Sequence, residues 1–200
     1  MKRCLNWILN GILLISIVFP SCSEEDGAID PYKDWTERNQ AFIDSVAVVA
    51  RNNPNEWLTI HTYKFLPGTE QGLEGNLQVD VNDYVYCKIL KKGQGVTPLF
   101  KDTVSVNYRG KLIPLFNGEE VVFDQSYQGE LKEEIAVPAK FNVNGVIEGW
   151  TTALQQMKEG DRWEVYIPSS LAYGAVNKPS IPANSTLIFD MHLVEVKPMR

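Results

Sequence analysis

The sequence predicts an α+β fold, a curved antiparallel half-barrel sheet of five to six strands wrapped around one short helix, with an N-terminal helical extension. Three observations predict it. The chain has 200 residues, 44% of them hydrophobic, which is enough for a globular core. Beyond residue 78 most segments alternate apolar and polar residues, as half-buried strands do. Only one segment there has a helical period, so a single helix must cover the apolar face of the sheet.

The first residues predict an export signal that ends in a cysteine. Lys2 and Arg3 precede an apolar run from Leu5 to Phe19, which is shorter than the roughly 20 residues of a membrane-spanning helix. This pattern is typical of a signal peptide over residues 1–21. The cysteine that follows, Cys22, resembles the lipid-modified cysteine of the bacterial lipoprotein lipobox, although the residues before it depart from the common box.

The position of Cys22 leaves two interpretations open. In one, Cys22 carries lipid and anchors the chain to the membrane; in the other, the signal is an ordinary secretory one and the cysteine is incidental. The acidic residues Glu24, Glu25 and Asp26 are similar to tags that route some lipoproteins to the outer face of the outer membrane. We therefore expect a protein of the cell envelope, lipid-anchored to the outer membrane on its periplasmic side or at the cell surface.

Charge and residue counts exclude several kinds of site. The net charge is −6 and the 19 Lys and Arg residues are scattered, so no nucleic-acid partner is expected. Cys87 is the one cysteine left after the signal and Cys22, which rules out an internal disulfide. His61 and His192 are isolated, so we expect no metal site and no cofactor. His192 lies in a strand-like alternation and is expected to face solvent.

An amphipathic helix is predicted from Asp34 to Arg51. Trp35, Phe42, Val46 and Val49 recur at helical intervals and form an apolar stripe. The stripe must be buried, either on the main domain, which is the commoner outcome, or on a second copy of the chain as a homodimer. In neither case do we expect this helix to contribute to a ligand pocket.

A glycine-rich stretch after this helix suggests the domain boundary. Residues 67–76 read PGTEQGLEGN, a loop or linker. We therefore divide the chain into a signal peptide (residues 1–21), an acidic tether with the helical extension (22–77) and a main domain (78–200).

The main domain contains six segments with the period of strands. Val85, Cys87 and Ile89 alternate with polar or aromatic neighbours in the first segment, and Leu187 to Leu193 do so in the last. In chain order the segments read DYVYCKIL, DTVSVNYRG, VVFDQS, AKFNV, RWEVYIP and STLIFDMHLVEV.

One short helix interrupts the strands. Trp150, Leu154 and Met157 stand at i, i+4 and i+7, and Gly160 is placed to end the helix as a C-cap. The residues before it, VIEGW, put a tryptophan at its start.

The order of these motifs resembles the FKBP-type peptidyl-prolyl isomerases. The blocks VNYRG, VFDQS, FNVNGVIEGW, LQQMKEGDRWEVYIPSSLAYG and IPANSTLIFDMHLVEV follow in family order between Tyr84 and Val196. The resemblance implies the same fold and catalysis of cis/trans isomerisation at X-Pro bonds. The lipobox and the N-terminal WTERN helix further resemble FKBP lipoproteins associated with gliding motility.

The resemblance also implies a pocket for the proline ring. Trp150 would form its floor, the lip would hold the substrate, and a tyrosine hydroxyl would reach the bound peptide. Implied partners are proline-containing polypeptides and macrolides of the tacrolimus and rapamycin type. The implied catalytic residues are Tyr108, Phe123, the buried acid Asp124, Trp150, Tyr173 and Phe189; the implied substrate-binding residues are Phe141, Val146, Ile147 and the flap residue Ile181.

The chain departs from the family pattern at three places. The hairpin between Tyr108 and Phe123 is longer than in the smallest members, Ala139 replaces a frequent aromatic, and Ala183 replaces the second proline of the usual IPP. The first change reshapes access to the pocket and the second widens it.

Two functions remain open at this stage. The first is a proline isomerase that folds envelope proteins through a dry aromatic pocket, without covalent chemistry. The second is a binding module or chaperone-like adaptor that keeps the fold without turnover. Nucleophilic hydrolysis is excluded, because no Cys-His or Ser-His pairing is present. Without the family pattern, four aromatics that the resemblance assigns to the pocket walls would be taken for ordinary core residues: Tyr108, Phe123, Phe141 and Phe189.

Overall fold

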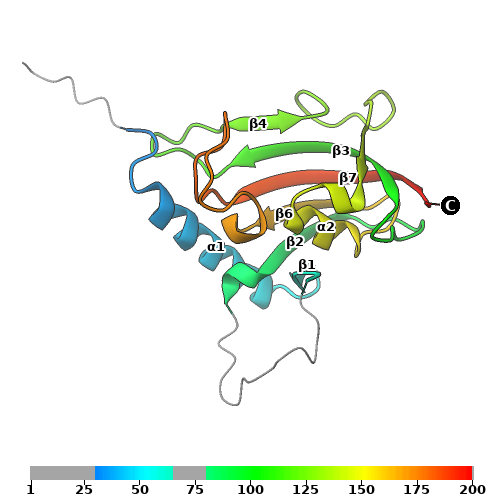
Figure 1. The fold of residues 1–200 in the computed structure, drawn as a ribbon, viewed down its shortest axis with the longest axis horizontal. Coiled ribbons are helices and arrows are strands. Elements are labelled where there is room, and N and C mark those ends of the chain that lie inside the picture. Colours follow the sequence, from blue (N-terminus) through cyan, green and yellow to red (C-terminus); the bar gives the residue numbers. More distant parts are fainter. Residues whose placement is uncertain (1–29, 65–79, 200) are drawn as a thin grey trace, which may run out of the picture.

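The computed structural model describes residues 30–64 and 80–199, which form one antiparallel sheet and two helices (Figure 1). The strand order is β1-β2-β6-β7-β3-β4, and β5 pairs with β3 beside β4. This sheet confirms the predicted curved antiparallel architecture. Its strands are β1 (Trp57–His61), β2 (Tyr84–Lys91), β3 (Thr103–Leu112), β4 (Val122–Gln125), β5 (Ala139–Asn142), β6 (Arg162–Ile167) and β7 (Leu187–Lys197).

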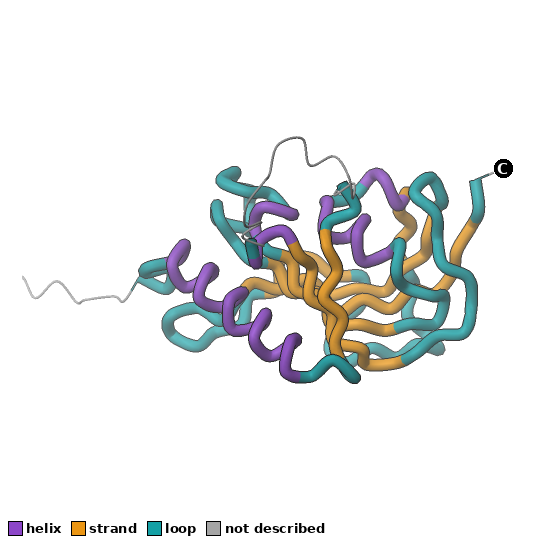
Figure 2. Tube along the Cα trace, turned by 90° about the horizontal axis from the view of Figure 1, so that it is seen from below, coloured by secondary structure: helices purple, strands orange, loops and turns teal. Residues whose placement is uncertain are grey.

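The two helices cover opposite faces of the sheet (Figure 2). On β2, Val85 and Cys87 point into the main core with α2 (Glu148–Leu154), whereas Tyr86 between them joins the cluster under α1 (Trp35–Asn52). Neighbouring residues of a strand point to opposite faces, so one strand serves both layers.

β1 is a strand that the sequence analysis did not predict. It pairs antiparallel with β2, from Trp57 opposite Lys88 to His61 opposite Tyr84. The segment counted as an extension therefore supplies an edge strand to the sheet of the main domain. Five residues, WLTIH, are too few for their alternation to stand out in the sequence.

Helix α1 forms where predicted but buries a different stripe. Val49 is 44% exposed and Phe42 is half-buried, whereas Ile43 is 1% exposed and was not in the predicted stripe. Trp35 and Val46 are buried as expected. The helix thus packs on the sheet of its own chain, and its buried residues are Trp35, Asn39, Ile43, Val46, Ala47 and Ala50.

Helix α2 is shorter than predicted. It ends at Leu154, and the predicted cap Gly160 instead takes φ 92° in the turn that leads into β6. Met157 is fully buried although it lies beyond the helix. The apolar spacing therefore predicted burial correctly and the length of the helix wrongly.

The prediction for His192 is wrong. It is 6% exposed, and its Nε2 lies 3.7 Å from Glu133 Oε2 of the loop between β4 and β5. Burial lowers the pKa of this imidazole and the Glu133 carboxylate opposes that shift. The loop covers a face of β7 that the alternation alone assigns to solvent.

Cys22, the signal peptide and the linker at residues 67–76 lie outside the described residues. Within residues 30–64 and 80–199, no helix is long and apolar enough to cross a membrane.

Candidate active site

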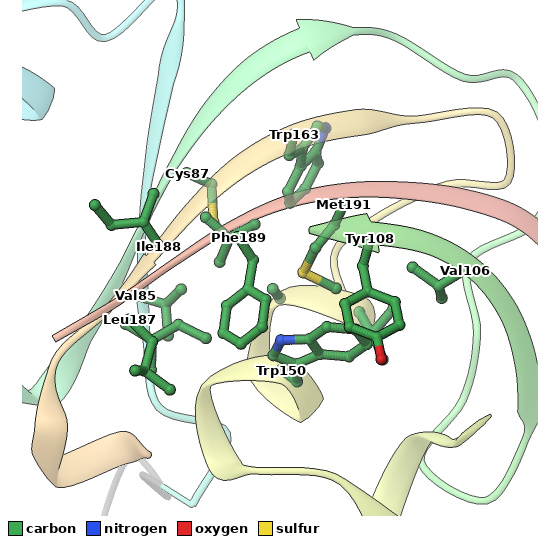
Figure 3. Close-up of a cluster of buried hydrophobic side chains, with 14 of the residues drawn as sticks. Val85, Cys87, Val106, Tyr108, Trp150, Trp163, Leu187, Ile188, Phe189 and Met191 are labelled. Carbon is green, nitrogen blue, oxygen red and sulfur yellow. The ribbon is translucent and has the colours of Figure 1, made fainter. Parts of the chain in front are cut away.

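The pocket begins with aromatic side chains that strand alternation places on one face. Tyr108 of β3 and Phe189 of β7 point from the sheet toward the indole of Trp150 on α2 (Figure 3). Phe123 of β4 and Phe141 of β5 join them from the strands that pair with β3. Five elements of the fold therefore meet at one aromatic group.

Trp150 is the centre of this group. It is 4% exposed, and its ring centroid lies 5.3 Å from Tyr108, 5.2 Å from Phe141 and 5.2 Å from Phe189. The interplanar angles are 72° to 84°, so all three neighbours meet it edge to face, a preferred geometry for aromatic pairs. Phe123 extends the aromatic group, because its ring centroid lies 5.5 Å from that of Phe189.

A hollow of about 400 Å³ opens above Trp150. The structure brings nine of the ten residues assigned to the pocket into its lining. The lining residues are Tyr108, Phe123, Asp124, Phe141, Gly145, Val146, Ile147, Trp150, Tyr173 and Phe189.

One polar pair lies at the wall. The Tyr108 hydroxyl donates a 2.8 Å hydrogen bond to Asp124 Oδ2. Burial raises the pKa of Tyr108, and the hydrogen bond to the carboxylate raises it further, so the hydroxyl stays protonated at neutral pH. Asp124 itself is exposed rather than buried, which corrects the prediction. It lies on the short edge strand β4, where little covers it.

The lip supplies a backbone donor. The carbonyl of Ile147 accepts hydrogen bonds from the N–H groups of Trp150 (3.0 Å) and Thr151 (3.1 Å), which starts α2. Among the described residues, no group accepts a hydrogen bond from the Ile147 N–H itself. This N–H, at the edge of the hollow, is available to a ligand carbonyl.

Tyr173 and Ile181 differ in position. Tyr173 is 36% exposed at the rim of the hollow, with Lys178 Nζ 5.1 Å from its ring centroid. Ile181 is 7% exposed and is not part of the lining. Its side chain packs into the core, so its predicted contact with the substrate is not supported.

Two glycines that the sequence analysis did not single out make room for the pocket. A Cβ on Gly110 would lie 2.6 Å from Phe189 and 2.7 Å from Phe123, the two rings packed over it. A Cβ on Gly149 would lie 2.3 Å from the Ile167 side chain, so α2 rests directly on the sheet. Each glycine stands inside a motif, VNYRG or VIEGW, but its reason is visible only in three dimensions.

The residues of the described ranges offer no metal site. They contain no group of three or more His, Cys, Asp or Glu side chains that could hold a metal ion.

Comparison with known proteins identifies the family. Residues 95–194 match the family model described as FKBP-type peptidyl-prolyl cis-trans isomerase. FkpA from Escherichia coli strain K12 is 45% identical over 112 residues, which are 56% of this chain and 37% of that protein. Peptidyl-prolyl cis-trans isomerase Mip from Coxiella burnetii is 45% identical over 111 residues, 55% of this chain and 44% of Mip.

Solved structures agree with the described fold. A peptidyl-prolyl cis-trans isomerase from Pseudomonas syringae superposes with a TM-score of 0.55 at 26% identity, covering 84% of this chain and 98% of that one. FkpA from Escherichia coli gives 0.51 at 32% identity, covering 83% and 64%. The chain spans less than half the length of the curated relatives described above. The resemblance to gliding-motility lipoproteins stays a prediction. The aromatic pocket, the sheet and the matched residues together show that the chain belongs to the FKBP-type peptidyl-prolyl cis-trans isomerase family.

Proposed function

We propose that this protein is a peptidyl-prolyl cis-trans isomerase that acts on proline-containing polypeptides of the cell envelope. The observation that carries the proposal is the enclosed indole of Trp150, with three rings at 5.2 to 5.3 Å around it and an open hollow above it. A core aromatic group would be filled on all sides, whereas this one borders an open hollow of about 400 Å³.

The physical problem is rotation about an amide bond. Resonance imposes a barrier of about 18–20 kcal/mol, so uncatalysed X-Pro isomerisation takes roughly 10–100 s. In the twisted transition state this resonance is lost, and with it part of the charge separation of the planar amide. An apolar pocket therefore stabilises the transition state relative to the ground state. No bond is formed or broken.

Hydrogen bonds hold the peptide while its proline rotates. The free N–H of Ile147 and the hydroxyl of Tyr173 stand at the rim, where peptide carbonyls can accept from them. A 10⁴-fold acceleration requires about 5.5 kcal/mol of differential stabilisation. Several aromatic contacts and two hydrogen bonds are sufficient for that amount.

The roles of the lining residues follow from their places. We assign Trp150 to the floor, and Tyr108, Phe123 and Phe189 to the walls. Asp124 orients the Tyr108 hydroxyl through its 2.8 Å hydrogen bond. Phe141, Val146 and Ile147 contact the substrate, and Ile181 is left out because it lies outside the hollow.

The envelope location rests on the start of the sequence. We propose that Cys22 carries lipid and anchors the chain to the outer membrane. One relative, 46% identical over 112 residues, is named outer membrane protein MIP from Legionella longbeachae. A fatty-acid probe should label the wild type in cells and not Cys22→Ser; equal labelling of both, or of neither, contradicts the anchor.

The activity is tested by NMR exchange spectroscopy on an Ala-Leu-Pro-Phe peptide. We expect the full chain to accelerate cis/trans exchange over buffer, and tacrolimus, proposed as a pocket ligand, to suppress it. Ala139 and the longer hairpin can weaken the binding of the macrolide without abolishing turnover of the peptide. A folded wild type that gives no acceleration refutes the isomerase and leaves a binding module as the function of the fold.

A further inference from the structure

The N-terminal half of α1 is hydrogen-bonded to the loop that leads from Tyr173 into β7 (Figure 1). We call residues 173–186 the rim loop. It begins at the rim of the hollow and ends three residues before the wall residue Phe189. Contacts that hold the rim loop in place therefore affect both the rim of the hollow and its wall at Phe189.

Asn39 makes the most buried of these contacts. It is 2% exposed, and its Oδ1 accepts a 2.7 Å hydrogen bond from the N–H of Thr186. Its Nδ2 donates to the carbonyl of Trp35 at 2.7 Å, which fixes the orientation of the amide. An amide at this position of a packed helix has no role in apolar packing, so its partner explains its presence.

Trp35 makes the second contact. Its indole Nε1 donates a 3.0 Å hydrogen bond to Ser185 Oγ, and the same hydroxyl donates to the carbonyl of Pro182 at 2.6 Å. Trp35 and Ser185 are both buried. The contact thus links the helix to the interior of the rim loop.

Asn184 closes the loop on itself and on α1. Its φ of 60° lies in the left-handed region, which asparagine tolerates better than most residues. Its N–H donates to the carbonyl of Gly174 at 2.8 Å, beside Tyr173, and its Nδ2 donates to Thr36 Oγ1 at 3.2 Å. The two ends of the loop are therefore held together next to the helix.

We propose that α1 is a positioning element of the active site, and that Asn39 and Trp35 set the rim loop so that Tyr173 can hold the peptide. This inference rests on the proposed function. Both residues precede the family-matched range 95–194, and the sequence analysis expected their helix to play no part in the pocket. Neither touches the hollow, so their effect on substrate passes through the rim loop.

The test compares two substitutions in the full chain, one turn apart on α1. Asn39→Ala leaves the Thr186 N–H without its partner. The control is Ile43→Val, which removes one side-chain carbon from the same helix. Ile43 packs with Trp57 and Tyr86 on the far face of the sheet. Each variant is measured by amide hydrogen exchange in the rim loop and by kcat and KM on the proline peptide.

We expect Asn39→Ala to speed exchange at Asn184 and Thr186 and to raise KM about fivefold, the equivalent of one hydrogen bond, with kcat within about twofold. Ile43→Val should change neither. Trp35→Phe, which keeps an aromatic ring in the core but removes the indole N–H together with part of the ring system, should shift both readouts in the same direction. Trp35→Phe replaces Asn39→Ala as the test variant if Asn39→Ala does not fold.

Several results would overturn the proposal. Faster loop exchange with an unchanged KM would make the contacts purely structural, and unchanged exchange would remove the link to the loop. An equal rise in KM for Ile43→Val would assign the effect to lost stability. If the wild type shows no turnover, the proposed isomerase fails, and the Kd of the same peptide replaces KM; absent or unaltered binding then refutes positioning as well.

Discussion

Two hollows of similar volume lie on opposite faces of the same sheet, and they differ in chemistry. The hollow over Trp150 measures about 400 Å³ and the other about 440 Å³. Neighbouring residues line them: Tyr108 and Phe189 face the first, and Arg109 and Asp190 face the second. The alternation of β3 and β7 therefore produces an aromatic cavity and an ionic one back to back.

Pairs of opposite charge line the ionic hollow. Arg162 Nε donates to Asp190 Oδ1 at 2.8 Å, and the Tyr127 hydroxyl donates to Asp190 Oδ2 at 2.9 Å. The hydrogen bond to Asp190 raises the pKa of Arg162, so the guanidinium stays charged. Glu120 accepts from Arg109 and Lys111 in the same hollow.

The contrast shows why volume alone does not identify the site. A cavity lined by ion pairs keeps its water and stabilises the charge-separated planar amide, which opposes rotation. The aromatic cavity offers little to the planar amide and more to the twisted one. Each of the following substitutions alters one hollow and leaves the other intact.

The largest effect is expected for Phe123→Ala. Loss of the ring opens the wall to water, and we expect kcat/KM to fall about 10- to 100-fold, with a stability loss of up to about 3 kcal/mol. The control is Phe116→Ala, which removes a 48% exposed ring outside the hollow. Thermal melts establish folding, and a folded Phe123→Ala with wild-type kcat/KM would contradict the role of the wall.

Gly110→Ala should narrow the aromatic hollow from below. The added Cβ would lie under 3 Å from the rings of Phe123 and Phe189, which must move into the space of the substrate. We expect about a tenfold lower kcat/KM and a stability cost of about 1–3 kcal/mol, as for overpacking in general. Unchanged peptide turnover would show that the rings have room elsewhere.

Tyr108→Phe should cost less, because the ring remains and only the hydrogen bond to Asp124 is lost. We expect about a fivefold reduction in kcat/KM, a similar one for Asp124→Ala, and no further loss in the double variant. Since burial raises the pKa of Tyr108, activity should be flat between about pH 6 and 9. Additive losses in the double variant would show that the two residues act separately.

The smallest effect concerns the ionic hollow and should not touch activity. Burial, together with the nearby Asp190, raises the pKa of Tyr127 from 10.0 to about 12. The unfolded chain thus loses this proton first, and stability falls as pH rises from about 10 to about 12.

Tyr127→Phe lacks this ionisation. We expect it to be slightly less stable than the wild type at pH 7, with the gap in melting temperature narrowing above pH 10. Peptide isomerisation at pH 7 should stay within twofold of the wild type. A widening gap, or a loss of turnover, would contradict the separation of the two hollows.

The sequence predicted the residues that line the aromatic hollow much better than the residues that hold them in place. The family motifs implied Tyr108, Phe189 and Trp150 as residues of the pocket. Gly110 and Asn39 were missed, because their roles depend on what lies opposite them in space and not on spacing along the chain.

The errors on α1 and β7 have a related cause. A stripe drawn through Phe42 and Val49 follows hydrophobicity, whereas the sheet selects the face that carries Asn39 and Ile43. His192 is buried by a loop from another part of the chain, which no local pattern reveals.

The most direct test of the account is where a proline peptide binds the wild type. An Ala-Leu-Pro-Phe peptide is titrated into the ¹⁵N-labelled full chain, and side-chain N–H resonances are followed for Trp150 Nε1 and Arg162 Nε. The Trp150 Nε1 atom is buried without a hydrogen-bond partner within the described residues, as is that of Trp163, which lies outside the hollow and serves as an internal reference. We expect a saturable shift at Trp150 with Arg162 and Trp163 unmoved. A shift at Arg162 with Trp150 unmoved would contradict it.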